Sequence, residues 1–322
     1  MPTATEHLAF AAAKDMNLTA IILTLNEAGH LPRCLESVRS AGASILVVDS
    51  FSTDATREIA EAYGARVVQH PFLNYASQFN WALSQLSPAV DWVLRLDADE
   101  YLTASLVEEI RSRLPRLAED VSGVFCGRRM TFQGRLIRFG GVFPIRVLRL
   151  FRNGKGQCEN RWMDEHIVAA GLKEDFNGEI IDDNLKSLTW WVSKHNAYAS
   201  REALDLLYLK YRSLPRKSSA DLQVSSQPGA KRWLKEAIYA RLPGGLRALL
   251  YFMYRYIIRL GFLDGPSGTA FHILQGFWYR YLVDVKIAEV ERYKATHRCD
   301  LEKAIEEILE IRLQSRVPDI DL

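Results

Sequence analysis

The sequence predicts an α/β fold, with a Rossmann-like parallel sheet followed by a helical C-terminal extension. Short apolar runs alternate with amphipathic helical patterns through the first third of the chain, as in strands joined by right-handed crossovers. The runs at residues 18–23, 45–48 and 92–96 are apolar at almost every position, which is typical of strands buried on both faces of a parallel sheet. A polar or acidic residue follows each run at once.

Helical patterns lie between these strands. Apolar residues recur at helical spacing after residue 30, where Pro32 suits a first turn, and Asp54 is suited to begin the next helix. We therefore expect helices at residues 30–40, 54–63 and 75–86, and a short strand at residues 66–69.

The later part of the chain is less regular. Asn177 and Gly178 predict a tight turn, with residues 179–181 as the returning strand. Residues 188–211 predict a helix.

Three carboxylates crowd the end of the run at residues 92–96: Asp97, Asp99 and Glu100. Such neighbours repel one another, and a bound cation relieves that repulsion directly. The alternatives are a chance Asp-x-Asp triplet, or a glutamate that favours the positive end of a following helix.

The acidic residues Glu27, Asp49, Asp97 and Asp99 all come just after predicted strands. Parallel strands end at one edge of their sheet, and ligands bind beyond that edge. Some of these residues are also ordinary turn formers and helix caps. Their coincidence at one edge favours a binding site.

Composition limits the remaining possibilities. The chain has 322 residues, of which 48% are apolar and 25% charged, as in globular proteins with one large domain or two. The four cysteines are scattered, so we expect free thiols. The first residues lack the pattern of a signal peptide, and no apolar run reaches about 18 residues. We expect a cytoplasmic protein.

Four segments in order carry a resemblance: TLNEAGHLPRCLESV, ILVVDSFSTDAT, ASQFNWAL and WVLRLDADEYL. Over residues 18–114 they resemble the nucleotide-sugar-binding half of the inverting family-2 glycosyltransferases, which have the GT-A fold. The chain is most similar to bacterial enzymes that extend lipopolysaccharide core or exopolysaccharide. The resemblance implies a hexosyltransferase-type enzyme.

The resemblance also implies roles for individual residues. It assigns nucleotide-sugar binding to Thr24, Asn26, Glu27, Asp49, Gln78, Asn80, Asp97 and Ala98. It assigns the divalent cation, Mg²⁺ or Mn²⁺, to Asp99 and Asp97. The chain departs from the family where Phe51 and Ala55 replace glycines and Phe79 replaces a basic residue. Arg95 or a later arginine is the candidate to supply that missing charge.

A base must accept the proton of the acceptor hydroxyl. In the similar enzymes a carboxylate after an Arg-Leu-Phe-Arg segment is taken as this base; Glu165 matches its position best, and Asp164 is the alternate. An isolated Asp-Glu-His is otherwise a solvated turn. On the acceptor side the candidates are Trp190, Lys194 and His195, for which core or interface packing is the alternative.

We expect four parts in the chain. They are an N-terminal tail (1–17), a GT-A domain (18–211) with a donor-binding half (18–114) and an acceptor and catalytic half (115–211), a linker (212–230), and a basic amphipathic helical region (231–322). Residues 231–263 contain seven basic side chains against one acid. Arg247, Arg255 and Arg259 share a helical stripe, which fits a helix over anionic lipid, or a packing helix whose arginines pair with the catalytic domain or grip acceptor phosphates.

Together these observations predict a metal-dependent glycosyltransferase, peripheral on the inner membrane. The donor would be a nucleoside-diphosphate sugar, UDP-linked on family grounds, and the acceptor a lipid-linked saccharide or lipopolysaccharide. No nucleic acid is expected, and the C-terminal helices are candidates for homo-oligomerisation. The alternatives are a sugar-phosphate nucleotidyltransferase, whose glycine-rich Arg-containing loop is absent, and a non-catalytic membrane-bound scaffold. The transferred sugar and the acceptor hydroxyl stay open.

Overall fold

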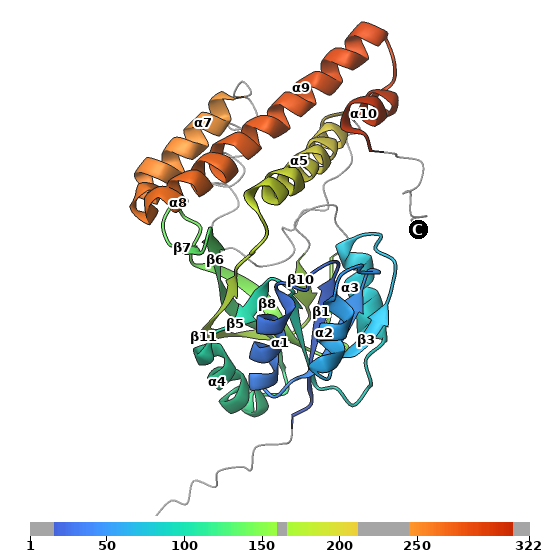
Figure 1. Cartoon of the computed structure of the whole chain (residues 1–322), viewed down its shortest axis with the longest axis vertical. Helices are drawn as coiled ribbons and strands as arrows, with labels where there is room; N and C mark the ends of the chain where they lie inside the picture. The colour runs from blue at the N-terminus through green and yellow to red at the C-terminus, as the bar shows by residue number, and fades with distance from the viewer. Residues whose placement is uncertain (1–15, 160–165, 212–244, 312–322) are drawn as a thin grey trace, which may run out of the picture. The chain divides into compact units, whose positions relative to one another are not determined.

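The computed structural model describes residues 16–159, 166–211 and 245–311. They form two compact units (Figure 1). The sheet unit is Met1–Gly134 with Phe143–Leu185, and the helical unit is Arg135–Val142 with Lys186–Leu322.

The sheet unit contains the main sheet, a small sheet and the helices that cover them. The main strands are β1 (Leu18–Thr24), β2 (Ser44–Asp49), β3 (Arg66–Gln69), β4 (Trp92–Asp97), β5 (Glu100–Leu102), β6 (Val121–Phe132), β8 (Ile145–Arg152) and β11 (Leu172–Asp182). The small sheet pairs β9 (Gly156–Cys158) with β10 (Ile167–Ala169). The helices are α1 (Leu31–Ser40), α2 (Thr56–Ala62), α3 (Tyr75–Ser84), α4 (Ala104–Ser112) and the short η1 (Leu114–Arg116).

The main sheet has a parallel half and a mixed half. Its strand order is β3-β2-β1-β4-β8-β6-β11-β5. The first four strands are parallel, as the sequence predicts, and β8 then runs antiparallel to both β4 and β6. The chain after β4 passes through Ala98 and Asp99 into β5, which pairs with β11.

Helices cover both faces of the sheet, and neighbouring residues of β1 show the division. Ile22 faces the core formed with α1 and α4, where Leu35 and Ile110 are fully buried. Ile21 faces the other core, formed with α3 and the small sheet, where Phe79 is fully buried. Each strand therefore contributes side chains to two cores, which explains its nearly continuous apolar sequence.

The prediction of a tight turn at Asn177 and Gly178 is wrong. Residues 172–182 form one strand, and its pairing with β6 shifts register between Asp175 and Glu179. A Cβ atom on Gly178 would lie 2.3 Å from the Leu106 Cα atom. The glycine lets α4 pack closely on an irregular strand, and the sequence signal for this packing is the same as for a turn.

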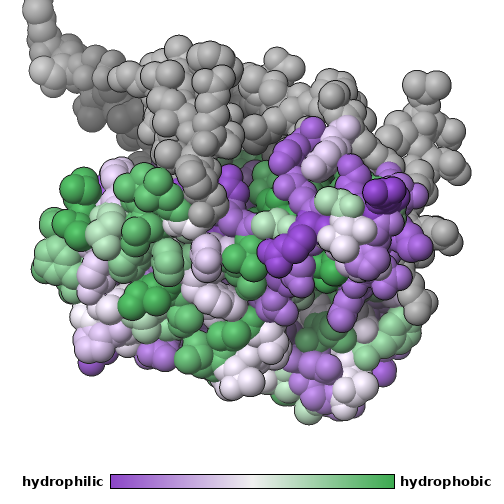
Figure 2. All heavy atoms as spheres, turned by 90° about the horizontal axis from the view of Figure 1, so that it is seen from above, coloured by the Kyte–Doolittle hydropathy of each residue, from purple (hydrophilic) through white to green (hydrophobic). Residues whose placement is uncertain are grey.

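The helical unit begins with β7 (Arg135–Ile137) and α5 (Leu188–Tyr211), whose predicted bounds are confirmed. It continues with α7 (Leu246–Met253), the π-helical η3 (Tyr254–Ile258), η4 (Gly261–Asp264), α8 (Gly265–Phe271), the π-helical η5 (His272–Trp278), α9 (Tyr279–His297) and α10 (Leu301–Leu309). Helices α5, α9 and α10 share a core that includes Leu204, Val283 and Ile305. Hydrophobic residues gather on the side of the surface where α7 and α8 lie (Figure 2).

Within the described ranges, none of the helices combines the length and the hydropathy that crossing a bilayer would require.

Candidate functional site

The carboxyl ends of β1, β2 and β4 lie side by side. Thr24 at the end of β1 pairs with Asp49 at the end of β2, and Leu23 pairs with Asp97 at the end of β4. Beyond the strand ends, Asp99 contacts Asn184 in the segment after β11, and Glu27 contacts His30, which accepts a hydrogen bond from Leu185 in the same segment. The predicted gathering of acidic residues at one edge of the sheet is therefore observed.

Asn26 ties the loop after β1 to the loop after β2. Its backbone N–H donates to the Ser52 hydroxyl at 2.8 Å, and its side-chain oxygen accepts from the Thr53 backbone N–H at 2.8 Å. Asn26 itself has a left-handed backbone, with φ of 55°. The two loops therefore form one connected wall at the edge of the sheet.

Asp49 is fully buried, and its carboxylate binds Ser52 in the loop after β2. It accepts hydrogen bonds from the Thr24 hydroxyl at 3.0 Å, from the Ser52 backbone N–H at 2.9 Å, and from the Ser52 hydroxyl. Its position is thus set by several donors from β1 and its own loop. A contact between Asp49 and a nucleotide stays a prediction.

Glu27 is positioned by a buried histidine. Its carboxylate lies 2.5 Å from Nδ1 of His30, and Nε2 of His30 accepts from the Leu185 backbone N–H at 2.8 Å. Because Nε2 accepts, Nδ1 carries the proton that is donated to Glu27. His30 therefore links the loop after β1 to the end of β11.

Gln78 and Asn80 lie on α3 and make different contacts. Gln78 is buried, donates to the Ser50 hydroxyl at 2.7 Å, and leaves its side-chain oxygen without a hydrogen-bond partner among the described residues. Asn80 makes two hydrogen bonds to the backbone of Cys158, at 2.8 and 2.9 Å. Gln78 thus supports the loop after β2, and Asn80 anchors β9.

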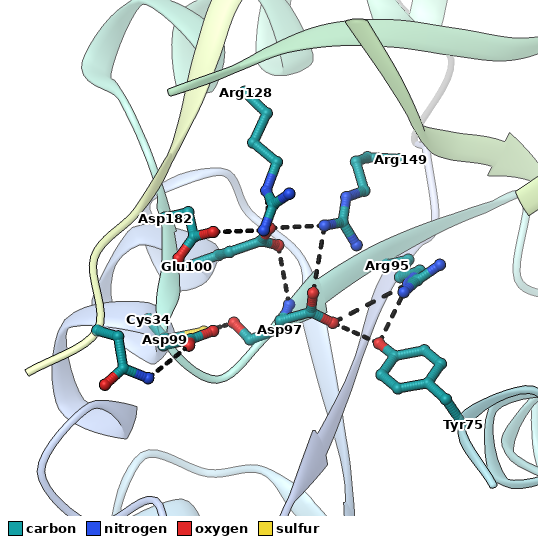
Figure 3. A network of polar contacts seen from close by, with 10 residues as sticks. Cys34, Tyr75, Arg95, Asp97, Asp99, Glu100, Arg128, Arg149 and Asp182 are labelled. Carbon is teal, nitrogen blue, oxygen red and sulfur yellow. Dashed lines mark hydrogen bonds and ion pairs between the residues drawn. The ribbon is translucent and has the colours of Figure 1, made fainter. Parts of the chain in front are cut away.

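Asp97 is the centre of a polar network (Figure 3). One of its oxygens accepts from the Tyr75 hydroxyl, and the other lies 3.2 Å from Nη2 of Arg149. Nε of Arg95 donates to the same Tyr75 hydroxyl at 3.1 Å. Although burial acts to raise it, the pKa of Asp97 lies well below its usual range because Arg149 and Arg95 stabilise the carboxylate.

Glu100 is the buried partner of two arginines. Oε1 lies 2.6 Å from Nη2 of Arg149 and 3.0 Å from Nε of Arg128, and Oε2 accepts from the Asp97 backbone N–H at 3.1 Å. Burial raises the pKa of Glu100 to about 7, against the opposing effect of Arg149, and Asp97 adds to the increase. Glu100 therefore shapes the turn from inside the protein.

Asp99 is the half-buried acid of the turn, and residues after β11 surround it. One carboxylate oxygen lies 2.9 Å from the Asn184 side-chain nitrogen, and the Asp99 carbonyl accepts from the Asp183 backbone N–H at 3.0 Å. Asp182 binds Arg128, and burial raises the pKa of Asp182 to about 6. Asp182, Asp183 and Asn184 were not predicted as site residues, although they follow apolar strand residues just as Asp97 and Asp99 do.

Arg95 occupies the neighbourhood of Phe79, where the family has a basic residue. The Arg95 guanidinium lies 4.3 Å from the centre of the Tyr75 ring and 5.8 Å from that of Phe79. A cation from β4 therefore lies against the helix position that has lost its charge. That Arg95 supplies the missing charge in donor binding stays a prediction.

Asp164 and Glu165, the candidate bases, lie outside the described residues. On either side of them, the Glu159 backbone N–H donates to the His166 carbonyl at 2.9 Å, and β9 pairs with β10. The two ends of this segment are thus held together, next to the strand that Asn80 anchors.

Trp190, Lys194 and His195, the acceptor-side candidates, lie on α5 in the helical unit. The Lys194 ammonium is 4.8 Å from the centre of the Trp190 ring. His195 stacks on Trp191, with 3.5 Å between ring centres, and burial lowers the pKa of His195. The rings of Tyr198 and Tyr279 also contact His195, each with its centre 5.8 Å from that of the imidazole.

The oxygen atoms of the turn suit a hard divalent cation. Magnesium in nucleotide sites is usually held by one or two carboxylates together with substrate phosphates and water. Asp99 supplies a partly accessible carboxylate, and the Asn184 amide lies beside it. Among the described residues no group of three His, Cys, Asp or Glu side chains is arranged to hold a metal alone. The residues therefore fit a cation shared with a phosphate ligand.

Comparisons with known proteins agree on one family. The family description "Glycosyl transferase family 2" matches residues 19–163. A lipopolysaccharide core biosynthesis glycosyltransferase, LpsC of Rhizobium meliloti, is 36% identical over 197 residues, which are 58% of this chain and 70% of LpsC. A glycosyltransferase of Rickettsia bellii is 43% identical over 93 residues, so the match spans only 31% of that protein.

Among solved structures, the mannosyltransferase PcManGT from Pyrobaculum calidifontis, in complex with GDP-Man and Mn²⁺, has a TM-score of 0.47 at 14% identity. The match covers 84% of this chain and 87% of that one, a likeness too low to assign a ligand. The matches to the family description and to LpsC are sufficient without it, and with the mixed sheet and its strand-end acids they show that this chain belongs to glycosyl transferase family 2.

Proposed function

We propose that this protein is a metal-dependent inverting glycosyltransferase, of hexosyltransferase type, that uses a UDP-sugar. The acceptor is a lipid-linked saccharide or lipopolysaccharide in the synthesis of a bacterial cell-surface polysaccharide. The observation that carries the proposal is the gathering of Glu27, Asp49, Asp97 and Asp99 at the carboxyl edge of the sheet.

The wall formed by the loops after β1 and β2 is the proposed site for the nucleoside. Thr24, Asn26 and Glu27 lie along it, and Asp49 and Gln78 support it from below. The exposed Phe51 ring stands on the same loop, with 54% of its surface accessible. An aromatic ring at this place offers a stacking surface for the base.

The diphosphate end of the donor is placed at Asp99. A divalent cation bound there would stabilise the negative charge that develops on the leaving diphosphate. Asp99, with Asn184 beside it, would hold this cation, and Asp97 lies in the neighbouring network of Arg149 and Tyr75. Glu100 keeps the turn in shape by holding the Asp97 backbone N–H.

Glu165, or Asp164, accepts the proton of the attacking hydroxyl group. Attack from the side opposite the leaving diphosphate inverts the configuration at the anomeric carbon, and a carboxylate on that side is the expected base. The hydrogen bond between Glu159 and His166 and the contact of Asn80 with Cys158 hold the ends of this segment beside the sheet.

The acceptor is proposed from the relative LpsC, whose name places it in lipopolysaccharide core biosynthesis. A lipid-linked acceptor is presented at a bilayer, so we place the enzyme in the cytoplasm, peripheral on the inner membrane. Trp190, Lys194 and His195 stay candidates for the acceptor side.

The test is turnover with a panel of nucleotide sugars, in Mn²⁺ or Mg²⁺, with lipopolysaccharide core as acceptor. Release of UDP that depends on metal and acceptor, and that Asp99→Asn and Glu165→Gln both abolish, would support the proposal. Pyrophosphate release from a nucleoside triphosphate and a sugar phosphate would instead identify a nucleotidyltransferase. Unchanged cell-surface glycan in cells carrying Asp99→Ala would identify a scaffold.

A further inference from the structure

The outer face of residues 245–263 is almost entirely apolar. Among these residues the exposed charged side chain is Arg259. The apolar side chains that are exposed on α7, η3 and η4 and at their junctions are Leu246, Leu249, Leu250, Met253, Tyr254, Ile257, Ile258, Leu260, Phe262 and Leu263. We call this surface the apolar face; it belongs to the side where hydrophobic residues gather in Figure 2.

The charged residues of the same segment are turned inward, and the helical unit supplies their partners. Nε of Arg247 donates to the Asp284 carboxylate at 2.9 Å. Arg255 is only 7% exposed and donates to the Gly140 carbonyl and to Gln275, both at 3.1 Å. The stripe of arginines expected to face lipid is thus largely internal.

This arrangement is the reverse of an ordinary amphipathic surface helix. A surface helix in water turns its apolar side to the core and its charged side outward. Here Arg247 and Arg255 are paired inside, and Ile257 and Ile258 are 50% and 69% exposed. Contiguous apolar surface of this kind in a soluble protein marks an interaction site.

The sequence directly before the apolar face indicates the partner. Directly before the apolar face the sequence carries Lys231, Arg232, Lys235 and Arg241 against one acid, Glu236. An anionic bilayer supplies the opposite charge for these residues and an apolar interior for the leucines.

We propose that the apolar face inserts into one leaflet of an anionic bilayer as a monotopic anchor. Tyr254 and Tyr281, each 45% exposed, carry the ring and hydroxyl that suit the headgroup level. The anchor bears on the proposed function because it would bring the enzyme to a lipid-linked acceptor. Membrane binding itself does not depend on sugar transfer.

Insertion and electrostatic adsorption respond differently to salt. A helix held to lipid by exposed arginines dissociates when salt screens the charges, at about 1 M where the Debye length is about 3 Å. A helix held by leucines and isoleucines that are buried in the bilayer stays bound at high salt. The inward arginines therefore predict attachment that resists salt and yields to detergent.

The experiment is flotation of the full-length protein with vesicles of phosphatidylethanolamine and phosphatidylglycerol. We expect flotation that persists at about 1 M salt. The double variant Leu250→Glu with Ile257→Glu should lower vesicle binding by tenfold or more, because two apolar side chains that would enter the bilayer become charged. Leu206→Glu, at an exposed leucine of α5, is the matched control and should float like the wild type.

Release of the wild type by salt, or flotation of the double variant equal to that of the Leu206→Glu control, would overturn the proposal. A dimer in solution that the double variant dissociates, without vesicle binding by the wild type, would overturn it in favour of a second copy. Circular dichroism shows whether each variant is folded. UDP binding by the double variant tests the donor site separately, so failure of the anchor and failure of the proposed function are distinguishable.

Discussion

The two units bury charged residues with opposite consequences. In the sheet unit, Arg128 and Arg149 lie against Glu100 beneath the half-buried Asp99, so the edge of the sheet is polar. In the helical unit, Arg247 and Arg255 lie against Asp284 and a backbone carbonyl, and the surface left outside is apolar. In the sheet unit the buried charged residues hold the polar edge in place. In the helical unit the arginines face inward, so the outer surface carries little charge.

This difference shows why buried ion pairs need a functional explanation. Replacing such a pair by apolar residues of similar volume is often neutral or stabilising, whereas removing one partner is costly. Arg149 and Glu100 are therefore not required for a stable sheet as such. Their value lies in holding Asp97 and the turn that follows it in one geometry.

The largest expected effect is on catalysis in the sheet unit. Asp99→Asn should lower kcat/KM by about a thousandfold, because stabilisation of the leaving diphosphate is worth several kcal/mol and each factor of ten is about 1.4 kcal/mol. Release of nucleoside diphosphate measures the effect. Thermal unfolding should be unchanged, and a protein that unfolds instead would show that Asp99 is structural.

The next effect compares stability in the two units. Glu100→Leu should lower the free energy of unfolding by about 3–5 kcal/mol, because it leaves the buried Arg149 without its nearest oxygen acceptor. Asp284→Asn should cost less, about 2 kcal/mol, because its partner Arg247 is 21% exposed and reaches water. Urea unfolding of both variants measures the difference, and an equal or reversed order would contradict the distinction between the units.

The pH dependence should also differ between the units. The pKa of Glu100 is raised from 4.5 to about 7, so the folded sheet unit retains a proton and loses stability as pH rises through this range. Burial lowers the pKa of His272 in the helical unit from 6.5 to about 4, so that unit loses stability as pH falls through its range. Hydrogen exchange of β6 and α9 peptides measures the two slopes. Glu100→Gln and His272→Gln should each flatten its own slope, and one common slope would refute the assignment.

The smallest effect concerns two exposed apolar residues with left-handed backbones, one in each unit. Phe51 has φ of 61° and Leu260 has φ of 58°. Replacing either by glycine should stabilise folding by about 1 kcal/mol, since the left-handed conformation costs other residues about that much. Phe51→Gly should weaken nucleotide binding alone, and Leu260→Gly should weaken vesicle binding alone. Calorimetry measures nucleotide binding and flotation measures vesicle binding. Weaker vesicle binding by Phe51→Gly, or weaker nucleotide binding by Leu260→Gly, would contradict the separate roles.

The parallel half of the fold and the edge that carries the site were predictable from the sequence. Strands buried on both faces leave continuous apolar runs, and a carboxylate after such a run marks a strand end. Asp97 and Asp99 were therefore predicted at the end of a strand, where the structure has them, and the bounds of α5 were correct.

Other features depend on contacts distant in sequence. Asp182 and Asn184 join the site because β11 lies next to β5, a pairing that no local pattern encodes. Gly178 serves packing against Leu106, where its local sequence predicts a turn. The inward direction of Arg255 depends on the Gly140 carbonyl, which is more than a hundred residues away.

The most direct test of the donor site is to measure Mn²⁺ binding by electron paramagnetic resonance, with and without UDP. The wild type should bind Mn²⁺ more tightly when UDP is present, because Asp99, with Asn184 beside it, shares the cation with phosphate oxygens. Asp99→Asn should lose this binding while remaining folded. UDP-dependent Mn²⁺ binding by Asp99→Asn equal to the wild type, or none by the wild type with any nucleoside diphosphate, would contradict the account.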